Sequence, residues 1–114
     1  MIIKGTTIEM TRGDNEDLTV YVPNKAFVSG DVVEITLRKS PASKQVMLHK
    51  TVDTFTEKEG KAVFHFAPSD TNTIPWGKYS YDVQVTFLDV GVKTIIKPSP
   101  FILGEEDTYA NSNE

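Results

Sequence analysis

The sequence predicts an all-β fold, an immunoglobulin-like β-sandwich of about seven antiparallel strands in two packed sheets. Three observations support this prediction. Apolar and polar residues alternate with a period of two over most of the chain, clusters of turn-forming residues separate the alternating segments, and no segment has sustained helical periodicity. Short strands with regular turns also occur in small barrels, so an OB-like barrel is the alternative.

The strand pattern occurs in seven segments of the chain. In order they are residues 6–11, 18–22, 33–38, 46–52, 62–66, 79–87 and 92–103. Turn clusters rich in Gly, Pro, Asp and Ser separate them, at residues 29–31, 40–43, 57–60, 75–77 and 89–91. Only residues 68–74 suit a helical turn, with Ser69 or Asp70 as its N-cap.

The segment 79–87 carries one further cue for an immunoglobulin-like fold. It opens with Gly77-x-Tyr79-x-Tyr81, at the position where such sandwiches place a corner tyrosine. Tyr79 suits that role, and Tyr81 falls where a disulfide-bearing domain has its second cysteine. The alternation places both rings on the same side as Val83 and Val85, so we expect them in the core.

The chain has 114 residues, which is enough for one domain that closes its core without disulfides or metals. We expect a single sandwich domain over residues 1–103 and a flexible acidic tail over residues 104–114. The tail carries four of the sixteen acidic residues and no Lys or Arg, which leaves twelve acids against twelve bases in the body. A neutral body predicts no nucleic-acid partner, and the lack of a long apolar run predicts no membrane insertion.

Residue chemistry gives no catalytic, metal or cofactor site, and the expectation is a protein that is not an enzyme and takes no small-molecule substrate. The absence of cysteine excludes thiolate ligands and nucleophiles. His49 and His65 lie on separate predicted strands and are expected at the solvated surface. A carboxylate pair needs no fixed spacing, so hydrolysis by two acids stays open.

The stretch Met10–Val22, MTRGDNEDLTVYV, contains a run of polar residues that looks like the start of a calcium loop and a tripeptide that cell-adhesion receptors bind. Asp14 begins a run of polar residues, DNED, that lacks the alternate carboxylates and the glycine of an EF-hand loop. The tripeptide Arg12-Gly13-Asp14 is expected by chance in roughly one chain in fifty of this length, and more often in exposed turns, where glycine and aspartate are enriched. We therefore interpret this stretch as a turn between two strands, and we expect the Arg12 guanidinium to pack against or pair with another part of the sandwich, with Asp82 as the named candidate.

Aromatic residues offer one alternative function, a carbohydrate-binding module that recognises host cell-wall polysaccharide. Trp76 with Tyr21, Tyr79 and Tyr81 would form a platform for a sugar ring, although aromatics equally fill sandwich cores. Trp76 lies in a predicted turn and is the candidate for a surface contact.

The order of motifs along the chain resembles a known family. The segments IEMTRGDNEDLTVYV, VEITLRKSP, FAPSDTNTIPWGKYSYDVQV and TIIKPSPFILGEED follow one another as in the N-terminal domain of phage baseplate upper proteins, and in related small tail or virion proteins, of tailed phages that infect Gram-positive bacteria. The positions that match the family pattern are Arg12, Gly13, Asp14, Asp70, Thr71, Gly77, Tyr79, Tyr81, Asp82 and Thr94.

The resemblance implies a structural role in a phage or prophage tail. It implies an immunoglobulin-like β-sandwich that serves as a baseplate or tail-tip assembly module and acts through protein–protein contacts. The implied partners are other phage tail or baseplate proteins and further copies of this chain in a homo-oligomer. The implied location is the virion, after synthesis in the cytoplasm of the bacterial host.

Overall fold

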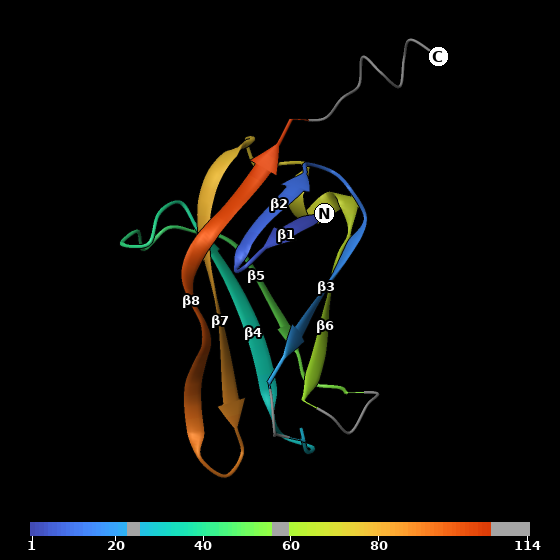
Figure 1. The fold of residues 1–114 in the computed structure, drawn as a ribbon, viewed down its shortest axis with the longest axis vertical. Coiled ribbons are helices and arrows are strands. Elements are labelled where there is room, and N and C mark those ends of the chain that lie inside the picture. Colours follow the sequence, from blue (N-terminus) through green and yellow to red (C-terminus); the bar gives the residue numbers. More distant parts are fainter. Residues whose placement is uncertain (23–25, 56–59, 106–114) are drawn as a thin grey trace.

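The computed structural model describes residues 1–22, 26–55 and 60–105, and this part of the chain forms eight strands and one short helix (Figure 1). The strands are β1 (Ile2–Lys4), β2 (Thr7–Thr11), β3 (Glu16–Tyr21), β4 (Val32–Arg38), β5 (Val46–Val52), β6 (Lys61–Phe66), β7 (Gly77–Phe87) and β8 (Gly91–Gly104). The helix α1 (Pro68–Thr71) is a single turn between β6 and β7.

The strands form two sheets that face each other across the core. One sheet has six strands in the order β1-β2-β8-β7-β4-β5, and the other consists of β3 and β6 (Figure 1). The prediction of an all-β sandwich is confirmed. The OB-like barrel is wrong, because the six-stranded sheet ends at β1 and β5 and does not close on itself.

The strand order follows the immunoglobulin pattern. In that pattern strands B and E share one sheet while strands C, F and G share the other. Here β3 and β6 occupy the B and E positions, and β4, β7 and β8 occupy the C, F and G positions. Two details of the prediction are wrong: Ile2–Lys4 forms an additional strand paired with β2, and β2 pairs with β8 in parallel.

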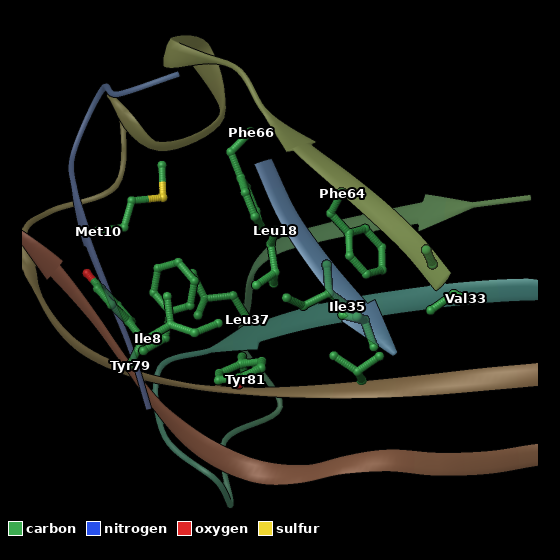
Figure 2. Close-up of a cluster of buried hydrophobic side chains, with 14 of the residues drawn as sticks. Ile8, Met10, Leu18, Val33, Ile35, Leu37, Phe64, Phe66, Tyr79 and Tyr81 are labelled. Atoms are coloured by element: carbon green, nitrogen blue, oxygen red, sulfur yellow. The ribbon is translucent and has the colours of Figure 1, made fainter. Parts of the chain in front are cut away.

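The core lies between the two sheets and is filled by the alternating residues of the predicted strands. Buried side chains from β4, β7 and β8 face those of β3 and β6, as Figure 2 shows for part of the cluster. The completely or nearly buried members include Ile8, Met10, Leu18, Val20, Val33, Ile35, Leu37, Ala62, Phe64, Phe66, Tyr81, Val83, Val85, Phe101 and Leu103. Each such side chain stabilises the fold by about 1.5–3 kcal/mol relative to exposure, so period-two burial is the main driving force for the sandwich.

Tyr79 forms the corner that the sequence predicts. Its hydroxyl donates a hydrogen bond to the backbone carbonyl of Pro75, four residues upstream, at 2.5 Å. Its ring is buried, and Figure 2 places it among the core side chains near Ile8 and Met10. The bond ties the turn before β7 to the strand itself and fixes the direction in which β7 enters the sheet.

Replacement of the corner hydroxyl should weaken the fold without changing it. We expect Tyr79→Phe to lower the free energy of unfolding by about 1–1.5 kcal/mol, because the ring stays in the core while one hydrogen bond is lost. Urea denaturation followed by tryptophan fluorescence measures this change. A Tyr79→Phe protein as stable as the wild type would show that the corner bond contributes nothing.

The N-cap of α1 lies two residues before Ser69, the earlier of the two predicted caps. Ala67 is the N-cap, and Asp70 acts as the third helical residue, whose carboxylate accepts a hydrogen bond from the Ala67 backbone N–H at 2.8 Å. The same oxygen of Asp70 accepts a hydrogen bond from Lys50 Nζ on β5 at 2.7 Å. Asp70 therefore links α1 to the six-stranded sheet from the third helical position, and it is not the N-cap.

Asp70 gives the fold a dependence on acidic pH. Burial alone would raise the pKa of Asp70, but hydrogen bonds from Lys50 and the Ala67 N–H, with the Lys50 charge, hold this pKa below 3.8. A lowered folded-state pKa means that the stabilisation is present above pH 3.8 and is lost as the pH falls through the folded value. We expect Asp70→Asn to cost about 1–2 kcal/mol at pH 7 and to flatten the loss of stability on acidification below pH 4, measured by thermal melts across pH.

The last strand of the described sandwich is β8. The strand β8 continues to Gly104, one residue beyond the expected limit of the sandwich. Of the expected acidic tail, residues 106–114 lie outside the described residues.

Candidate interaction surface

The turn that contains Arg12, Gly13 and Asp14 is a corner of the fold. Gly13 has a positive φ of 82°, which favours glycine, and its backbone N–H donates a hydrogen bond to Thr71 Oγ1 at 2.8 Å. Thr71 lies in α1 and is completely buried. The turn after β2 is therefore docked on α1, which brings together two segments that are 58 residues apart and that both carry the family resemblance.

Asp82 has a different partner from the one expected. Its carboxylate accepts a hydrogen bond from Arg38 Nη1 on the adjacent strand β4 at 2.7 Å. Arg12 is half-buried, and its backbone N–H donates a hydrogen bond to the Gly104 carbonyl at the end of the sheet. The strand β7 begins at that same end with Gly77, and Asp82 lies five residues further along it. At about 3.3 Å per residue this separation exceeds the reach of an arginine, so Arg38 holds Asp82 in place of Arg12.

The two histidines lie at the surface, as expected, and each contacts one carboxylate. His49 Nε2 lies 2.8 Å from Glu34 on the six-stranded sheet, and His65 Nδ1 lies 2.6 Å from Asp17 on the two-stranded sheet. Within the described residues no group of three or more His, Cys, Asp or Glu could hold a metal ion. These pairs are cross-strand contacts on solvated faces, which is a common use of histidine in sheets.

Two grooves on the described part of the surface are well formed, and neither combines two acids. The first has a volume of about 450 Å³ and is lined mainly by Pro41, Pro98 and Pro100, with Lys39 and Lys78 at its rim. The second has Glu9 as its one acidic side chain. Neither groove therefore has the pair of carboxylates that glycoside hydrolysis requires.

The aromatic residues do not assemble into a platform. Trp76 is 59% exposed in the turn before β7, as predicted, but Tyr79 and Tyr81 are buried in the core. Tyr21 is also exposed, yet it ends β3 at the opposite end of the sandwich from Trp76 (Figure 1). Among residues 1–22, 26–55 and 60–105, the two other tyrosines of the expected platform, Tyr79 and Tyr81, are therefore not beside Trp76 at the surface.

Four exposed apolar residues belong to the loop before β4, to the turn between β7 and β8 and to the start of β8; that turn is the lower tip of the ribbon in Figure 1. We call Val28, Leu88, Val90 and Val92 the hairpin end. Their exposed fractions are 54%, 70%, 59% and 61%, which is high for aliphatic residues in a small domain. A contiguous exposed apolar patch on a folded domain is typical of a surface that contacts another protein.

A buried carboxylate holds the hairpin end in place. Asp31 is completely buried and accepts two backbone hydrogen bonds of 2.9 Å, from the N–H of Val28 and the N–H of Leu88. The two donors belong to different loops, the one before β4 and the one after β7. Gly30, with a φ of 102°, lets the first loop pass beneath the Leu88 side chain. Asp31 therefore fixes the two loops against each other and presents a rigid apolar end.

The strand β8 also has an open edge next to the hairpin end. β2 pairs with β8 only from Phe101 to Gly104, while β7 pairs with it on the other side from Gly91 to Leu103, with register shifts at Ile95 and at Lys97–Pro98. In the described structure no strand pairs with residues 91–97 on the β2 side; we call this segment the open edge. An unpaired strand edge can pair with an extended segment of another chain.

Comparisons with known proteins add no family to this description. No protein-family model matches the chain, and no curated protein matches it. No helix of the described residues is long and apolar enough to cross a membrane.

Proposed function

We propose that this chain is a non-enzymatic structural protein of a phage or prophage, a baseplate or tail-tip assembly module that acts through protein–protein contacts. In this proposal it works in the virion, beside other tail proteins and further copies of itself. The observation that carries the proposal is the hairpin end, where four aliphatic side chains are exposed and where Asp31 joins two loops by accepting a backbone hydrogen bond from each.

Two further observations support an assembly role. The motif order that resembles baseplate upper proteins includes the turn at Gly13 and the helix at Thr71, and these two segments are in direct contact. The described grooves and the paired histidines offer no arrangement of acid, base or nucleophile for catalysis. A surface with an apolar end and an unpaired strand edge suits binding of other proteins.

Light scattering after size-exclusion chromatography, combined with chemical cross-linking, tests the proposal. The chain is measured alone and mixed with tail proteins encoded by the adjacent genes. We expect an oligomer, a stable mixed complex, or both. A strict monomer that binds no tail component would contradict the proposed function.

A carbohydrate-binding module remains a second candidate because Trp76 is 59% exposed. A single exposed tryptophan can stack on one face of a sugar ring. Binding to cell-wall polysaccharide by the wild type, and its loss in Trp76→Ala, would favour this function. The absence of sugar-dependent binding would eliminate it.

A further inference from the structure

The open edge of β8 ends just before the residues that pair with β2. β8 is fourteen residues long, but β2 covers only its last four. Pro98 and Pro100 lie just before the covered part and lack the backbone N–H that a neighbouring strand would need. Between them, the Ser99 and Thr6 hydroxyls form a hydrogen bond of 2.9 Å, which ties the β1–β2 turn to β8 at this point.

Residues 91–97, which precede Pro98, have no neighbouring strand on the β2 side in the described structure. In an antiparallel pair, the N–H and C=O groups of every second residue point away from the partner strand. Residues 91–94 pair regularly with β7, so these groups face outward along this part of the open edge, where no second neighbour is described. Register shifts follow at Ile95 and Lys97, and the Lys97 carbonyl accepts a hydrogen bond from the Ser99 hydroxyl at 2.7 Å. The edge therefore has the geometry to hydrogen-bond an extended segment.

The side chains of the open edge carry positive charge and therefore favour a negatively charged segment as the binding partner. Lys93 and Lys97 are both exposed, and β8 has no acidic residue in its fourteen positions. Val92 is exposed, and Ile95 and Ile96 are half-buried, so the edge also offers apolar contacts. Pairing with the same edge of a second copy would bring four lysines together without an acid, which is unfavourable.

We propose that the open edge of β8 takes an extended, acidic strand segment of a partner protein, which pairs with residues 91–97 in line with β2. Acidic side chains on that segment contact Lys93 and Lys97, and its apolar side chains lie beside Val92 of the hairpin end. This inference rests on the proposed assembly role and adds to it the chemistry of the partner. The lysines disfavour self-pairing and favour a partner of opposite charge.

Two synthetic peptides test this proposal on the intact protein. One has the sequence of residues 91–98 with capped ends, and the other is the same peptide with both lysines replaced by glutamate. The two have the same length and apolar residues and differ only in charge. Binding is followed at low salt by NMR chemical shifts and by protection of the amides of residues 92–97 from hydrogen exchange.

We expect the glutamate peptide to bind the wild type about tenfold more tightly than the lysine peptide, because each cross-strand charge pair changes sign. The Lys93→Glu/Lys97→Glu protein should reverse this preference, and circular dichroism checks that it keeps its fold. Equal binding of both peptides, binding of neither, or shifts on β5 in place of β8 would overturn the proposal. If the doubly reversed protein still forms the mixed complex with tail proteins, the edge proposal fails while the proposed function stands.

Discussion

The Asp31→Ala protein is expected to lose about 2–4 kcal/mol of unfolding free energy, a large part of the stability of a domain of this size. The carboxylate of Asp31 is completely buried and accepts the backbone N–H groups of Val28 and Leu88. Alanine would leave both donors without this partner, and each buried, unsatisfied N–H costs about 1–3 kcal/mol. The melting temperature should fall by roughly 10–15 °C.

The local effect of this substitution is as informative as the global one. Hydrogen exchange of the Val28 and Leu88 amides should accelerate more than that of amides in the centre of β4 or β7, since the two loops lose their common anchor. Asp31→Asn is the matched control, because it keeps one acceptor oxygen and should lose about half as much stability. An Asp31→Ala protein with unchanged exchange at both amides would contradict the role assigned to this carboxylate.

Tyr81→Ala is expected to have the other large effect, a loss of about 3–5 kcal/mol. The Tyr81 ring is 2% exposed and meets Phe101 edge-on, with ring centroids 5.9 Å apart. Its hydroxyl donates to the Thr6 carbonyl at 2.5 Å, so this side chain also ties the β1–β2 turn to the core. Alanine leaves a cavity between the sheets and releases the turn. Calorimetry measures the loss.

Tyr81→Phe separates the ring from the hydroxyl and should cost only about 1 kcal/mol. Burial raises the pKa of Tyr81 to about 12. The hydroxyl therefore stabilises the fold fully below pH 10, and this stabilisation is lost as the pH rises from 10 through 12. Tyr81→Phe should weaken the alkaline loss of stability. If it costs as much as Tyr81→Ala, packing of the ring is not the main contribution.

The sequence predicts most of this fold because its strands are half-buried and alternate. The pattern at Tyr79, Val83 and Val85 identifies both the longest strand and its buried face, and the corner hydrogen bond of Tyr79 follows from the position of that residue. The parallel pairing of β2 with β8 was not predicted, because alternation reveals a strand but not its neighbour. The strand Ile2–Lys4 has exposed side chains and so carries no burial pattern.

The candidate surface was harder to predict than the fold. The hairpin loop at Asp89–Gly91 is predicted from its turn residues, but exposure of Leu88 and Val90 depends on how far the hairpin extends beyond the opposing sheet. The sequence pattern around Asp31 predicts only an ordinary turn residue. Its burial and its second hydrogen bond come from a loop 57 residues away, which no local pattern reveals. Similarly, Asp82 meets Arg38 through strand pairing.

The most direct test of the assembly role is complex formation by a protein altered only at the hairpin end. Leu88→Ser/Val90→Ser removes two exposed apolar side chains, while Val63→Ser on the outer face of β6 is the matched control. Light scattering of each protein, mixed with the proteins that the adjacent genes encode, measures complex formation. The assembly role predicts that the hairpin-end protein keeps its melting temperature but loses the complex, and that the control retains it. Complex formation equal to that of the wild type would contradict the role of this surface.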